Sequence, residues 1–102
     1  MNVVVLAPAK KFIENLEHDA RSKIHTLILL LQEYGHKLSM PDAKPIGGGL
    51  WELRLQTRPA IRILYGFCRG EAVLVLGLRK QRPALLPKEV ELAHKRLTAY
   101  CY

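Results

Sequence analysis

Apolar residues in the first third of the chain follow a helical period after a short opening strand. Residues 3–6 form a β-branched apolar run that predicts a strand, and Pro8 suits the first turn of a helix. A second helix is predicted from Asp19, its N-cap, to a stop at Gly35. Its apolar positions have i, i+3, i+4 and i+7 spacing: Ile24, Leu27, Ile28 and Leu31. The segment 40–49, rich in proline and glycine, is interpreted as a loop.

From residue 50 onward the apolar period changes to two. Residues 51–56 and 61–67 alternate as strands do, and residues 72–78 form an apolar run typical of a strand covered on both faces. A final helix is predicted from Pro87, with a buried stripe of Val90, Ala93, Leu97 and Tyr100. The order β-α-α-β-β-β-α predicts one α+β domain over residues 1–102. We expect a mainly antiparallel four-stranded sheet, packed by an N-terminal helical hairpin and a C-terminal helix.

Positive charge is concentrated in the second half of the chain. The net charge is +7; residues 1–49 contribute six Lys/Arg against five acids, and residues 50–102 contribute ten against four. This imbalance favours a polyanionic partner, nucleic acid ahead of an anionic membrane, although many proteins are simply basic. The longest apolar run, residues 27–31, is too short for a membrane span, and the N-terminus lacks the features of a signal peptide. We therefore expect a soluble, cytoplasmic protein with no membrane partner.

Cysteine, glycine and histidine patterns restrict the chemistry. Cys68 and Cys101 make a poor disulfide framework for a chain of 102 residues, which favours a reducing compartment. Gly47–Gly49 precede a predicted strand rather than a helix, so a phosphate-binding glycine loop is not indicated. The four histidines show no metal-binding spacing. We therefore expect neither a metal nor another cofactor.

The charges on the alternating strands define a candidate site. If the apolar positions face the helices, Glu52 and Arg54 project from the opposite face, and a short turn brings Arg62 beside them. Arg79 and Lys80, at the end of the third strand of this series, are expected to reach the same rim. Such cations can hold an RNA backbone and stabilise charge on a phosphate, while Glu52 takes a proton from a ribose hydroxyl. The alternative is a solvated face with cross-strand ion pairs, each contributing well under about 1 kcal/mol.

Four sequence blocks resemble the phage-derived branch of the RelE/HigB-like toxins. They are Gly49-Leu50-Trp51-Glu52-Leu53-Arg54, Arg62-Ile63-Leu64-Tyr65, Leu76-Gly77-Leu78-Arg79-Lys80 and Pro87-Lys88-Glu89. The resemblance covers most of the chain and implies the same order of elements. It implies the toxin of a type II toxin–antitoxin system: a metal-independent endoribonuclease that cleaves mRNA, commonly on the ribosome. The ribose 2′-hydroxyl would attack the adjacent phosphate and leave a 2′,3′-cyclic phosphate. A cognate antitoxin, often a helix-turn-helix protein encoded by the adjacent gene, is also implied.

The resemblance also implies roles for single residues. Arg62 matches the phosphate-contacting arginine of these toxins, and Arg54 and Lys80 match basic positions on the neighbouring strands. Glu52 is the general base on chemical grounds, as the one carboxylate of this region. Lys80 is the default general acid because arginine holds its proton too tightly. Together Glu52, Arg54, Arg62 and Lys80 form the predicted catalytic set, and Arg79 and Arg82 the predicted RNA-binding residues.

The chain also departs from the toxin pattern. Leu76 and Leu78 occupy places where the family commonly has a histidine and a phenylalanine, and Gln81 stands where a second lysine is expected. A rival interpretation is therefore a non-enzymatic protein of the same fold, such as a DNA gyrase inhibitor or a basic binding module. Catalysis requires Glu52 and Arg62 on an accessible face, whereas a protein-binding toxin could bury or pair them.

Overall fold

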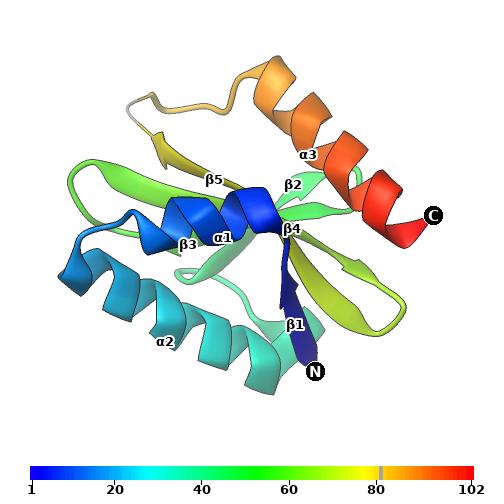
Figure 1. Cartoon of the computed structure of the whole chain (residues 1–102), viewed down its shortest axis with the longest axis horizontal. Coiled ribbons are helices and arrows are strands. Elements are labelled where there is room, and N and C mark those ends of the chain that lie inside the picture. Colours follow the sequence, from blue (N-terminus) through cyan, green and yellow to red (C-terminus); the bar gives the residue numbers. More distant parts are fainter. Residues whose placement is uncertain (81) are drawn as a thin grey trace.

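A five-stranded sheet with helices on both faces forms the molecule (Figure 1). The computed structural model describes residues 1–80 and 82–102, so Gln81 lies outside the described residues. The strands lie in the order β1-β5-β4-β3-β2, and every neighbouring pair is antiparallel except β1 with β5. The elements are β1 (Asn2–Val5), α1 (Ala7–Glu14), α2 (His18–Tyr34), a 3-10 helix (Gly35–Lys37), β2 (Ala43–Gly47), β3 (Leu50–Leu55), β4 (Ala60–Cys68), β5 (Glu71–Lys80) and α3 (Pro87–Cys101).

The sheet confirms the α+β class and the mainly antiparallel pairing, but the expected strand count is wrong. The segment interpreted as a loop contains β2, which makes five strands instead of four. Pro45 is tolerated there because β2 is an edge strand and pairs only with β3. Gly47 ends β2, and Gly48 and Gly49 form the turn to β3; their φ angles of 97°, 63° and 82° lie in a backbone region that favours glycine. The three glycines therefore shape a turn between two antiparallel strands.

Two apolar layers hold the helices against the sheet. On one face, α1 and α2 cover alternate residues of β3, β4 and β5, including Leu53, Ile63 and Leu74. On the other face, α3 packs over Leu64 and Val73 and the residues around them. The strand β5 contributes to both layers, which confirms that residues 72–78 form a strand covered on both faces. Among the described residues, no helix is long and apolar enough to cross a bilayer.

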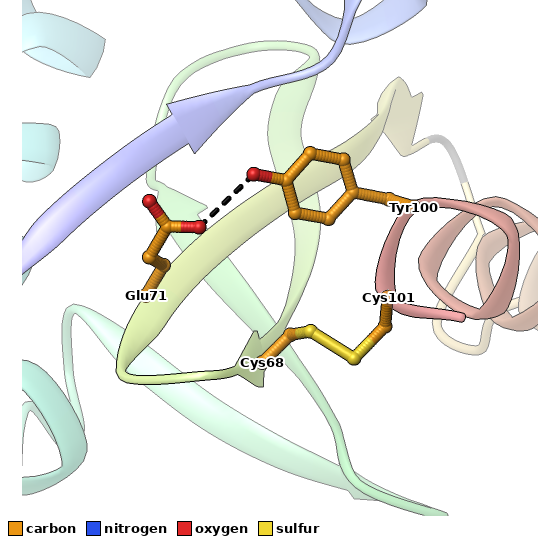
Figure 2. Close-up of a disulfide and its surroundings, with 4 residues drawn as sticks. All are labelled: Cys68, Glu71, Tyr100 and Cys101. Carbon is orange, nitrogen blue, oxygen red and sulfur yellow. Dashed lines mark hydrogen bonds between the residues drawn. A yellow bond between two sulfur atoms is a disulfide. The ribbon is translucent and has the colours of Figure 1, made fainter.

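The C-terminal end of α3 is joined to the turn between β4 and β5, as Figure 2 shows. Cys68 and Cys101 form a disulfide across 33 residues of sequence, with Cα atoms 6.0 Å apart. Beside it, the Tyr100 hydroxyl donates a hydrogen bond of 2.9 Å to Glu71 Oε1. The expectation of an unpaired cysteine set is thus wrong, because the sheet brings these distant residues together. Cys101, not the exposed Tyr100, completes the buried stripe of α3.

Candidate functional site

Strands β3 and β4 bring Glu52, Arg54 and Arg62 together on the face that α3 partly covers. Arg54 and Arg62 lie directly opposite each other in the antiparallel register, and Glu52 is two residues before Arg54 on the same strand. The Nε atoms of both arginines lie 3.6 Å from Glu52 Oε1. The shared face expected from the alternating pattern is therefore present.

In this triad of Glu52, Arg54 and Arg62, Glu52 and Arg62 are buried and Arg54 is partly buried, so the alternative of a solvated face is wrong. The accessible face expected for catalysis by Glu52 and Arg62 is also wrong, and burial with pairing is the arrangement expected of the non-enzymatic alternative. The exposed side-chain fractions are 2% for Glu52, 5% for Arg62 and 16% for Arg54. Arg62 Nη1 donates to the backbone carbonyls of Leu55, at 3.2 Å, and Ile61, at 2.9 Å. Within the described part of the chain, Glu52 Oε2 and the two arginine Nε atoms have no hydrogen-bond partner. The triad thus keeps unused hydrogen-bonding capacity beneath the surface.

Charge in the triad is unbalanced, with one carboxylate for two guanidinium groups. Burial lowers the pKa of Arg62 below its ordinary value; Glu52 opposes this change and Arg54 adds to it. A guanidinium remains protonated in spite of such a shift, because its ordinary pKa is so high. Desolvation and the neighbouring Arg54 both raise the free energy of the charged Arg62. An additional anion at this place would lower it.

A groove of about 430 Å³ leads from the surface to Glu52. Its cationic side chains are Lys44 of β2, which is paired with Glu52 in the sheet, and Lys80 at the end of β5. Lys44 is exposed and Lys80 is half-buried. The remaining walls are apolar and come from β2, from the connection to α3 and from the first turn of α3: Pro45, Ile46, Pro83, Ala84, Leu85 and Val90. The groove therefore combines a positively charged mouth with apolar walls.

The two other predicted cations lie elsewhere. Arg79 is paired with Ile61, which packs under α1 and α2, and it lines a different groove with Glu17, Asp19 and Arg58. The expectation that Arg79 reaches the same rim as Lys80 is wrong, because neighbouring residues of a strand point to opposite faces. Arg82 Nη2 lies 2.9 Å from Glu89 Oε1, an oxygen that also accepts the Leu86 backbone N–H at 2.7 Å. The Arg82 side chain thus forms an ion pair with Glu89 in the first turn of α3.

Sequence reasoning missed two residues near the groove. Lys44 was hidden because its strand was interpreted as a loop; the alternation of Ala43, Lys44 and Pro45 gives too short a signal to reveal it. His94 lies one helical turn after Val90, and its imidazole contacts the position that a side chain at Gly48 would occupy. The i, i+4 spacing from Val90 is the signal that places His94 on the groove side of α3.

Among residues 1–80 and 82–102, no group of three or more His, Cys, Asp or Glu side chains is arranged to hold a metal ion.

Comparison with known proteins shows which family the chain belongs to. A search of curated proteins finds no match. Residues 11–98 match the family model of the phage derived protein Gp49-like (DUF891), and this match covers most of the chain and every element from α2 to β5. The chain therefore belongs to the Gp49-like phage-derived proteins, a RelE/toxin-like family.

Proposed function

We propose that this protein is the toxin of a type II toxin–antitoxin pair and cleaves mRNA in the groove above Glu52. The observation that carries the proposal is the gathering of Lys44, Arg54, Arg62 and Lys80, from four strands, around one carboxylate. This set has a formal charge of +3, and part of it is shielded from water. A phosphodiester is the anion that a +7 protein of this family would meet on RNA.

Binding in the groove is assigned to the cations that a ligand can reach. Lys44 and Lys80 line this groove with Glu52, whereas Arg54, with 16% of its side chain exposed, lines a different groove with Lys23 and Asp42. The two lysines would hold the backbone phosphates, and the apolar walls would accept an unstacked base beside them. Arg62 lies beneath, where its positive charge adds to the electrostatic potential at the phosphate.

Glu52 is assigned a positioning role in this proposal. Its Oε1 faces two guanidinium groups and only 2% of its side chain is exposed, so a ribose hydroxyl has little access to it. A carboxylate in this place fixes the direction of both arginines, as supporting groups around a site commonly do. Glu52 thus fixes the direction of Arg54 and Arg62, and the catalytic set that would contact RNA in the groove is Lys80 and Lys44.

The reaction proposed is transesterification followed by release of the downstream RNA. The 2′-oxygen bonds to the adjacent phosphorus and the bond from phosphorus to the 5′-oxygen breaks, which leaves a 2′,3′-cyclic phosphate and a 5′-hydroxyl. The Lys80 ammonium donates a proton to the leaving 5′-oxygen. Among the described residues that line the groove, Glu52 is the one carboxylate and it is covered. We therefore propose that a ribosomal group takes the 2′-hydroxyl proton, so that cleavage depends on the ribosome.

Expression of the protein in bacteria tests this function directly. Wild-type protein is expected to arrest growth and fragment a reporter mRNA; Lys80→Ala should reduce the rate of fragmentation by about 10²-fold or more. Lys95→Ala is the matched control, because Lys95 is exposed on α3 and does not line the groove. Coexpression of the helix-turn-helix protein expected from the adjacent gene should restore growth. Growth arrest with intact mRNA and broken DNA would instead support the gyrase-inhibitor alternative.

A further inference from the structure

The C-terminal end of α3 is attached covalently to the sheet through one pair of cysteines. Cys68 is the last residue of β4 and Cys101 is the last residue of α3, and the two are the only cysteines in the chain. The hydrogen bond from Tyr100 to Glu71 lies beside the disulfide and joins α3 to the first residue of β5 (Figure 2). Both cysteines are buried, at 4% and 9% exposure.

The rest of α3 is held on the sheet by noncovalent contacts. Its buried residues are Ala93 and Cys101, while Val90 and Leu97 are only partly buried against the second apolar layer. One further contact is polar: Arg96 Nη1 donates a hydrogen bond of 2.9 Å to the backbone carbonyl of Val75. In the last two turns, Leu97 packs closely on Gly66 of β4. The disulfide is the covalent part of an attachment that also includes Leu97 and Arg96.

We propose that Cys68–Cys101 is a thiol–disulfide exchange site that sets how firmly α3 is docked on the sheet. In the oxidised protein α3 stays docked over Leu64 and Val73. In the reduced protein its C-terminal turns dissociate from the sheet and dock again reversibly. This inference is independent of RNA cleavage, because it concerns the docking of α3. If the protein works in a reducing compartment, a regulatory role fits, since disulfides there are usually transient or redox-sensing.

The exchange step needs a reductant of the small-thiol class, such as glutathione. The thiolate of one reductant molecule attacks a cysteine sulfur, the protein S–S bond breaks, and a mixed disulfide forms; a second reductant thiolate then releases the protein thiol. Two electrons pass to the protein, two protons are taken up by its sulfurs, and the reductant leaves as its own disulfide. Access is provided at Cys101, because it is the last residue of α3 and helix ends fray.

The test combines a chemical count with a dynamic measurement on the intact chain. Protein is equilibrated over a series of reduced to oxidised glutathione ratios, and free thiols are alkylated and counted by mass. We expect a transition between zero and two alkylated cysteines. In the reduced protein, amide hydrogen exchange in residues 97–102 should accelerate at least about tenfold, while the amides of β4 stay protected. A doubly substituted Cys68→Ser/Cys101→Ser protein should exchange at the fast rate in every buffer.

Tyr100→Phe separates the disulfide from its neighbour. This variant loses the bond to Glu71 but keeps both cysteines, so it should still switch between slow and fast exchange with the glutathione ratio. The inference is overturned if the thiols cannot be interconverted, or if exchange in residues 97–102 is equal in the oxidised and reduced proteins. Either result leaves the proposed RNA cleavage untouched.

Discussion

Replacing Glu52 by glutamine measures what the buried triad contributes. The substitution preserves the size of the side chain and removes its charge, so the two guanidinium groups lose their shared partner. At 3.6 Å and an effective dielectric constant of about 20, each Glu52–Arg pair gives about 4–5 kcal/mol of gross attraction. Desolvation of the carboxylate offsets part of this sum. Removing one member of a buried ion pair typically costs about 3–5 kcal/mol, and we expect Glu52→Gln to lower the free energy of unfolding by that amount.

A double variant tests the repulsion between Arg54 and Arg62 that remains once Glu52 has lost its charge. Arg54 and Arg62 lie opposite each other in β3 and β4. Among the described residues, Glu52 is the carboxylate that forms ion pairs with both, so its loss leaves two neighbouring positive charges without an anionic partner. The double variant Glu52→Gln/Arg54→Gln should therefore lose less stability than the sum of the two single variants. A coupling of this sign is expected for residues of one charge network.

Urea denaturation followed by circular dichroism measures these changes. Glu91→Gln is the control, because Glu91 is exposed on α3, and its effect should stay within about 0.5 kcal/mol. The reasoning fails if Glu52→Gln costs less than about 1 kcal/mol, the value of a solvent-exposed ion pair. It fails as well if the single substitutions are additive.

Two further predictions concern packing and alkaline pH. Gly77→Ala would place a Cβ against the Phe12 ring, so the free energy of unfolding should fall by about 1–3 kcal/mol, and Phe12→Leu in the same background should recover part of it in urea titrations. Burial raises the pKa of Tyr65 above its ordinary value near 10, so the unfolded chain ionises first and stability should decline as pH rises above about 10. Tyr65→Phe should weaken that decline and cost little at neutral pH, since Tyr65 Oη lacks a hydrogen-bond partner in the described residues; Tyr102→Phe, at an exposed position, should keep it. An unchanged alkaline decline in Tyr65→Phe would contradict this assignment.

Local periodicity carried most of the fold prediction. The apolar spacing of α2, the alternation of β3 and β4 and the apolar run of β5 are each visible without a structure, because each lies on one regular element. The strand β2 was missed because an edge strand tolerates Pro45, and proline and glycine otherwise indicate a loop. An edge strand can contain the same residues, proline and glycine, that in a sequence indicate a loop.

The candidate site was predictable where it depends on one strand pair. Alternation placed Glu52, Arg54 and Arg62 on one face, but it gave no information on their burial, which depends on β2 beside β3 and on the connection to α3. The bond between Cys68 and Cys101 was invisible for the same reason: the two residues are 33 positions apart and meet only through packing of α3 on the sheet. Burial and long-range pairing are properties of the assembled fold.

The chemistry of the RNA ends tests the central claim most directly. Purified protein is incubated with ribosomes stalled on a defined mRNA, and both termini of every fragment are identified. We predict a 2′,3′-cyclic phosphate and a 5′-hydroxyl at the same internucleotide position, made by the wild-type protein and by Lys95→Ala and nearly absent with Lys80→Ala. Intact mRNA, or cleavage at equal rates by the Lys80→Ala and wild-type proteins, would contradict the assignment of the groove.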